Sequence, residues 1–112
     1  MGIRLSKPWL PLDAASRLSG QLGVYQLGDD AGDVLLIAYA GGRSRFGLRG
    51  EVENARERVP AATQYRVEIT TAYLTRYQEL LMLHQADYGT LPAHNDPVPG
   101  LGRLSPLPTK MG

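Results

Sequence analysis

Cysteine is absent from this chain of 112 residues. Its absence excludes disulfide scaffolds, zinc sites built on thiolates and enzymes with a cysteine nucleophile. Long hydrophobic runs are absent too: no stretch approaches the roughly 18 apolar residues that a transmembrane helix needs. Residues 1–8 also lack the apolar core of a signal peptide. From these absences we expect a cytoplasmic protein that has no membrane partner.

An excess of charge of one sign is also missing. Lys and Arg total 12, Asp and Glu total 11, and the formal net charge is +1. Domains that bind nucleic acid are usually more basic, although a local patch can matter more than the total. Such a patch lies between residues 43 and 77, where seven arginines stand against four glutamates. This local excess is compatible with contact to phosphate groups.

The clearest local signal predicts a β-hairpin. Residues 22–27 and 34–39 are two apolar runs rich in strand-forming side chains, and the cluster of Gly and Asp between them is typical of a turn. The second run barely alternates between apolar and polar residues. That pattern is typical of a central strand covered on both faces, so we expect other elements to pack on each side of the sheet.

The remaining elements follow from periodicity and from start and stop residues. The predicted helices are 14–21 (N-cap Asp13), part of 48–59 (stopped by Pro60) and 72–88 (closed by Gly89). Residues 64–70 alternate between apolar and polar side chains and predict a third strand. The order predicts an α+β fold, with a small three-stranded antiparallel or mixed β-sheet flanked by helices.

The same patterns divide the chain into three parts. We expect an extended N-terminal segment over residues 1–12, with Trp9 docked on the core, and a single domain over residues 13–95. Residues 96–112 hold four prolines and little charge. This composition is typical of a flexible tail. The length allows one domain and is too short for two ordinary ones.

Gly23-Val24-Tyr25 opens the first strand of the hairpin, arginines follow the hairpin, and Glu79 and Asn95 come later. The order of these short motifs over about residues 20–95 resembles the GIY-YIG nuclease superfamily. In that family a Gly-Ile-Tyr strand is followed by a Tyr-Ile-Gly strand, an Arg-bearing helix, a third strand and a helix that carries a Glu. The chain departs from this pattern in Leu36-Ile37-Ala38, where Leu36 replaces the second Tyr and Ala38 the Gly.

The resemblance implies a metal-dependent endonuclease or phosphodiesterase that acts on nucleic acid. The resemblance implies that Tyr25 acts near the attacking water and that Glu79 binds the metal ion, Mg²⁺ or Mn²⁺. The Arg that stabilises the phosphate is Arg49 or Arg43, and Arg43 can join the amides of Gly41-Gly42 in an anion-binding concavity. Cleavage of a phosphodiester develops negative charge, which a cation and a metal ion stabilise. Magnesium keeps many of its waters, so one carboxylate can be enough.

Asn95 and Tyr39 are the candidates for binding the substrate. Structural roles are the alternatives: Glu79 can pair with Arg76 three residues earlier on its helix, and Asn95 can serve a turn. Leu36 cannot donate a hydrogen bond, which favours a catalytically inactive GIY-YIG-like domain that binds nucleic acid or a protein. A structural domain outside the family is a third hypothesis. We also expect a homo-oligomer or a separate protein partner, because no DNA-reading module accompanies the domain.

Overall fold

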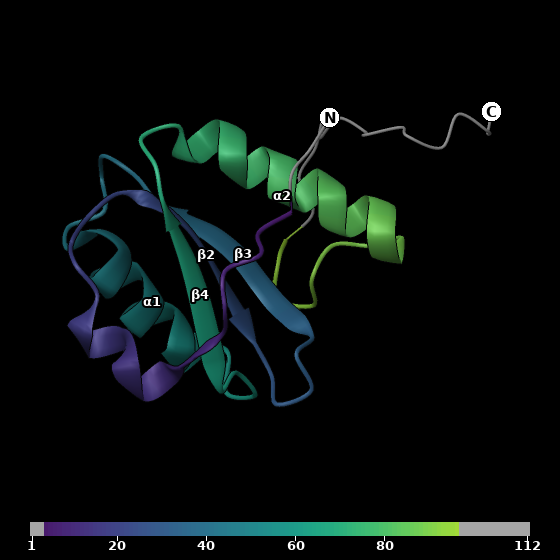
Figure 1. Ribbon diagram of the computed structural model, residues 1–112, viewed down its shortest axis with the longest axis horizontal. Coiled ribbons are helices and arrows are strands. Elements are labelled where there is room, and N and C mark those ends of the chain that lie inside the picture. The colour runs from purple at the N-terminus through teal and green to yellow at the C-terminus, as the bar shows by residue number, and fades with distance from the viewer. Residues whose placement is uncertain (1–3, 97–112) are drawn as a thin grey trace.

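The structure is a computed structural model that describes residues 4–96 (Figure 1). Within this range the elements are β1 (Leu10–Pro11), the 3₁₀ helix η1 (Leu12–Arg17), β2 (Gly23–Gly28), β3 (Val34–Ala40), α1 (Gly47–Arg58), β4 (Gln64–Ile69) and α2 (Tyr73–Tyr88). The strands form one antiparallel sheet in the order β1-β4-β2-β3. The predicted α+β fold, a small sheet flanked by helices, is therefore confirmed.

Of the two hairpin strands, β2 rather than β3 is central in the sheet. All six residues of β2 are buried, and the strand is hydrogen-bonded to β3 on one side and to β4 on the other. The apolar run of β3 predicted a central position, but β3 lies at an edge of the sheet. The loop after α2 covers that edge, where the N–H of His94 donates to the C=O of Leu35 at 3.0 Å. This cover explains why an edge strand carries so few polar side chains.

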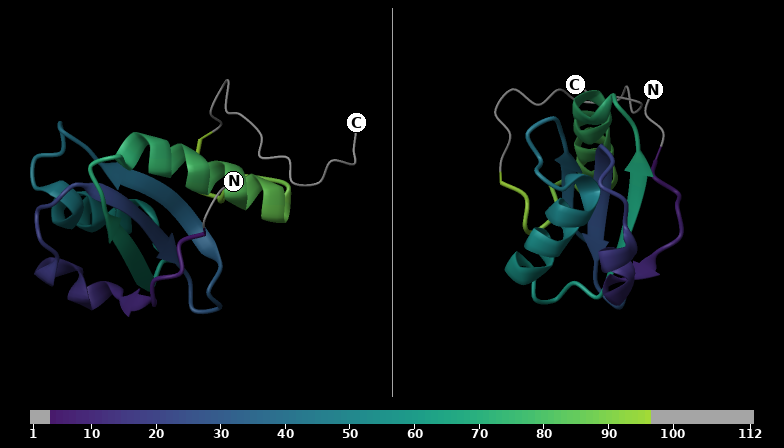
Figure 2. Two further views of the ribbon diagram at one scale, coloured as in Figure 1. Left: turned by 45° about the horizontal axis from the view of Figure 1, so that its top comes forward. Right: turned by 90° about the vertical axis from the view of Figure 1, so that its left-hand side faces the viewer.

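Alternate residues of β2 enter two cores on opposite faces of the sheet. Tyr25 and Leu27 pack with Val52 of α1. Val24 packs on the other face with Leu81 of α2. Figures 1 and 2 show the sheet between the two helices. This separation matters for function, because side chains on opposite faces cannot meet at one site unless they reach around an edge.

The sheet has four strands rather than the three expected. The extra strand is β1, in which Leu10 pairs with Tyr65 of β4 inside the segment predicted to be merely extended. Beside it, the guanidinium of Arg66 lies 4.2 Å from the ring centroid of Trp9. A Cβ at Gly28 would lie 2.6 Å from Cη2 of Trp9. Gly28 therefore makes room for the indole that docks the N-terminal segment on the sheet.

The first helix differs from its prediction. A 3₁₀ helix occupies Leu12–Arg17 in place of an α-helix over residues 14–21, and its N-cap residue is Pro11 rather than Asp13. The proline ring fixes φ near −65°, which suits the start of a helical turn, so the helix begins earlier than predicted. Leu18 is already extended and ends it. The other predicted strands and the helix predicted over residues 72–88 begin and end within one residue of their predictions, and α1 occupies nearly all of the stretch in part of which a helix was expected.

The expected C-terminal tail lies, from residue 97 onward, outside the described residues. Among residues 4–96 no helix has the length and apolar character needed to cross a membrane.

Candidate functional site

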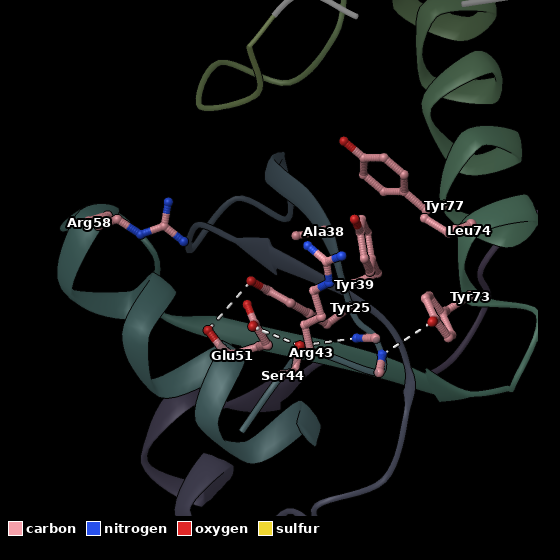
Figure 3. A pocket seen from close by; sticks show the side chains of 12 residues that line it. Tyr25, Ala38, Tyr39, Arg43, Ser44, Glu51, Arg58, Tyr73, Leu74 and Tyr77 are labelled. Carbon is pink, nitrogen blue, oxygen red and sulfur yellow. Dashed lines mark hydrogen bonds between the residues drawn. The ribbon is translucent and has the colours of Figure 1, made fainter. Parts of the chain in front are cut away.

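A cleft of about 570 Å³ opens where β3 ends, between α1 and α2 (Figure 3). Its lining comes from β2, β3, the loop that follows β3, and both helices. The volume falls in the range of roughly 300–1,000 Å³ that is usual for ligand sites. Three of the predicted site residues line this cleft: Tyr25, Tyr39 and Arg43. A smaller hollow of about 150 Å³ lies on the α2 face of the sheet.

The loop after β3 is tied to both helices. The N–H of Gly41 donates to Oγ of Ser44 at 3.0 Å, and the Ser44 hydroxyl donates to Oε2 of Glu51 in α1 at 2.9 Å. The N–H of Gly42 donates to the hydroxyl of Tyr73 in α2 at 3.1 Å. Both glycine amides are thus used inside the protein. The anion-binding concavity of free amides that the sequence suggested is therefore not formed.

Tyr25 lines the cleft from β2, and its side chain is fully buried. Its hydroxyl donates to the C=O of Glu51 at 3.4 Å, which is a long hydrogen bond. Burial, and to a lesser degree the negative charge of Glu51, raise the pKa of Tyr25 well above its usual value of about 10. Tyr25 therefore stays protonated near neutral pH. Its phenol supports the backbone of Glu51 from inside the wall of the cleft, and it cannot act as a phenolate base.

Two exposed arginines line the cleft, Arg43 from the loop and Arg58 from the last turn of α1. Neither forms a hydrogen bond or an ion pair with another residue among those described. Arg49, the other arginine predicted from the resemblance, is exposed on α1 and does not line the cleft. Arg58 and Glu51 were not predicted as site residues, although a spacing of seven residues places both on one face of a helix. That spacing was the signal that could have found them.

Three tyrosines line the side of the cleft next to α2. The ring of Tyr39 stacks on Tyr73, with centroids 5.5 Å apart and planes at 20°. It also meets Tyr77 edge-on, at 5.0 Å and 61°. Such offset and edge-on pairs are the favoured arrangements of aromatic rings. The cleft thus combines two cations, one carboxylate and a group of aromatic rings.

A comparison with protein families gives a match over residues 3–87 to a domain of unknown function, DUF7508. The chain belongs to this family. The matched residues include the whole sheet, α1, most of α2 and every residue that lines the cleft. The comparison with curated proteins found no match. The function of the DUF7508 domain therefore has to be argued from the chemistry of the cleft.

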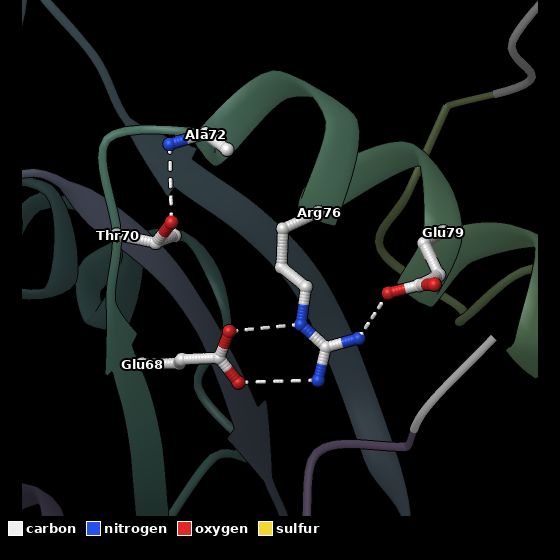
Figure 4. Close-up of polar contacts among 5 residues, drawn as sticks. All are labelled: Glu68, Thr70, Ala72, Arg76 and Glu79. Carbon is white, nitrogen blue, oxygen red and sulfur yellow. Dashed lines mark hydrogen bonds and ion pairs between the residues drawn. The ribbon is translucent and has the colours of Figure 1, made fainter.

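Glu79, the predicted metal ligand, lies outside the cleft of this DUF7508 domain. Its carboxylate pairs with Arg76, as the structural alternative expected, and Arg76 also donates to both oxygens of Glu68 at 2.9 and 3.1 Å (Figure 4). Glu68 stands opposite Val24 in the sheet and so faces α2, whereas Tyr25 faces α1. The structure therefore does not bring Glu79 and Tyr25 together.

Asn95, a predicted substrate-binding residue, instead closes the outer edge of β3. Its Oδ1 accepts the N–H of Ile37 at 2.8 Å, and its Nδ2 donates to the C=O of the same residue at 2.8 Å. These two bonds reproduce the pattern of a neighbouring strand. Both polar atoms of the Asn95 amide are therefore hydrogen-bonded to the edge strand β3, and Asn95 does not line the cleft.

The carboxylate that lines the cleft is Glu51, not the Glu79 that was predicted to bind a metal ion. Among residues 4–96, no three His, Asp or Glu side chains are grouped so that they could hold a metal ion. Glu79 does not fit as a ligand, because its charge is paired with Arg76. Glu51 lines the cleft, and Ser44 occupies one of its oxygens. A single carboxylate fits Mg²⁺, which takes few protein ligands and keeps its waters.

Proposed function

We propose that the DUF7508 domain binds nucleic acid in this cleft, with Arg43 and Arg58 on the phosphate backbone. The observation that carries the proposal is that both exposed guanidinium groups line one cleft and lack an ion partner among residues 4–96. Guanidinium groups match phosphate oxygens in charge and geometry. Because phosphate contacts supply most of the affinity for nucleic acid, a local pair of arginines can suffice in a domain of net charge +1.

The resemblance to the GIY-YIG superfamily supports this proposal in part. Tyr25 and Arg43, which the resemblance implies, line one concave surface together with Tyr39. That family places the first-strand Tyr and an Arg beside the phosphate. Glu79 and Asn95 are engaged elsewhere, and for that reason we rank nucleic-acid binding ahead of cleavage.

Metal-dependent cleavage of a phosphodiester is the second candidate function, and the position of Glu51 favours it. Glu51 would hold Mg²⁺ or Mn²⁺, and the ion would stabilise the negative charge that develops on the phosphate. Arg43 and Arg58 would hold the phosphate in place. Tyr25, whose side chain is fully buried, would hold the backbone of Glu51 through its hydrogen bond and would not act as a base, since its pKa is raised by burial.

Fluorescence anisotropy with labelled DNA and RNA oligonucleotides tests the binding proposal. The double substitution Arg43→Ala, Arg58→Ala should weaken binding by about tenfold or more, because a hydrogen bond to a charged group contributes about 1.5–3 kcal/mol. Arg49→Ala is the matched control, since Arg49 is exposed on the same helix as Arg58 but lies outside the cleft. Equal affinity of the wild type, the double variant and the control would contradict the proposal.

A gel assay with labelled oligonucleotides and added Mg²⁺ or Mn²⁺ tests cleavage separately. Glu51→Gln should abolish cleavage and Glu79→Gln should retain it, because only the first carboxylate lines the cleft. If the wild type cleaves neither DNA nor RNA, the second candidate function is excluded and the binding proposal stands unaffected.

A further inference from the structure

Tyr39, Tyr73 and Tyr77 form an aromatic wall on the α2 side of the cleft, which we call the tyrosine wall (Figure 3). One end of this wall is held in place, because the hydroxyl of Tyr73 accepts the N–H of Gly42 at 3.1 Å. The ring also lies close over Gly41, where a Cβ would come within 2.6 Å of Cε1. Stacking of Tyr39 on Tyr73 extends this support to β3. The wall is therefore ordered before any ligand binds.

The tyrosine wall stands at the margin of the α2-side core. Tyr73 and Tyr77 are partly buried against that core. Tyr39 keeps 36% of its surface exposed, and the neighbouring Leu74 keeps 51%. Both line the cleft as well. Apolar and aromatic surface that remains exposed in a concave site is typical of a site that binds a ligand.

The wall and the arginines occupy different parts of the same cleft. Figure 3 shows Arg58 on the α1 side, Tyr77 and Leu74 on the α2 side, and Arg43 between them. Proteins that bind single strands combine the same two features: a positive groove follows the backbone, and aromatic side chains stack on bases. In a duplex the base faces are covered by their neighbours in the stack, so a wall of rings could not reach them.

We infer that the cleft takes an unpaired segment of nucleic acid, with a base stacked on the tyrosine wall and the adjacent phosphate on Arg43. This inference rests on the proposed function and narrows its ligand from nucleic acid in general to unpaired nucleotides. It carries no sequence preference, because every base presents a π face to an aromatic ring.

Anisotropy with a single strand and with the duplex of the same sequence and length tests the inference. The wild type should bind the single strand at least about tenfold more tightly. Tyr39→Leu should weaken binding of the single strand by about 5- to 100-fold, the range expected for the loss of one stacked base. Tyr39→Phe keeps the ring and should bind like the wild type. Tyr88→Leu is the matched control, since Tyr88 is 70% exposed on α2 and lies outside the cleft.

A strand that contains 2-aminopurine gives a second measurement that needs no variant. Stacking on the tyrosine wall should quench its fluorescence when the wild type is added, and Tyr77→Leu should reduce the quenching. Equal affinity for the single strand and the duplex, or no quenching on binding, would overturn the inference. If binding still depended on Arg43 in that case, the proposed function would remain intact. Absence of binding to any nucleic acid would instead overturn the proposed function itself.

Discussion

Asn95→Ala is the substitution that most sharply separates a structural role from a role at the site. The side chain of Asn95 makes two hydrogen bonds of 2.8 Å to the backbone of Ile37. Ile37 is itself only 1% exposed. The substitution therefore leaves a donor and an acceptor of a buried strand residue without their partners, at the edge where the sheet ends.

The loss of stability can be estimated from these contacts. A hydrogen bond contributes about 0.5–1.5 kcal/mol net, so two of them contribute about 1–3 kcal/mol to the free energy of unfolding. Water that enters the opened edge would reduce the loss toward the lower end. Nucleic-acid affinity should stay within about twofold of the wild type, because Asn95 does not line the cleft.

Urea unfolding of the wild type and of Asn95→Ala measures the stability difference, and hydrogen exchange of the Ile37 amide reports whether the edge of β3 has opened. Asp96→Ala is the control in the neighbouring position, since Asp96 is exposed. Unchanged stability together with slow Ile37 exchange would refute the reasoning. Loss of binding without loss of stability would place Asn95 at the site after all.

Three further substitutions have expected outcomes. Glu79→Gln should lower stability by about 1 kcal/mol through its pairing with Arg76 and leave binding unchanged in anisotropy. Gly41→Ala should displace the ring of Tyr73, because the new Cβ would lie 2.6 Å from it, and weaken single-strand binding about fivefold. Tyr25 has a raised pKa in the folded protein, so the unfolded chain ionises first and stability falls as the pH rises above about 10. The decrease in the free energy of unfolding between about pH 8 and pH 11, measured by urea unfolding, should therefore be smaller in Tyr25→Phe than in the wild type.

Most of the fold could be predicted, because hydrophobic periodicity is a local property. The bounds of the hairpin strands, the third strand and α2 agree with their predictions within one residue, and α1 lies where a helix was expected. Two features depend on contacts between residues that are far apart in the sequence, and no local sequence pattern predicts them. One is the two-residue strand β1, which pairs Leu10 with Tyr65. The other is the loop at His94 that covers β3 and allows an apolar strand to lie at an edge.

Some residues that line the cleft could be singled out from the sequence because they match a motif, as Tyr25 and Arg43 do. The site was not predictable where function depends on which elements meet. Tyr73 and Tyr77 lie four residues apart on one face of α2, a spacing that is as typical of core residues as of residues that line a site. The spacing of three residues did indicate the pairing of Glu79 with Arg76, but it could not indicate Glu68 of β4, the second partner of Arg76. The spacing of residues predicts which side chains share one face of a helix. It does not predict which residues of other elements contact that face.

The salt dependence of binding to a single-stranded oligonucleotide tests the central claim most directly. The logarithm of the association constant falls linearly with the logarithm of the salt concentration, with a slope of about 0.7 per phosphate contacted in a single strand. Arg43→Ala and Arg58→Ala should each reduce the slope by about 0.7, whereas Arg49→Ala should leave it unchanged. Identical slopes for the wild type and all three variants would contradict the assignment of the cleft as the phosphate-binding site.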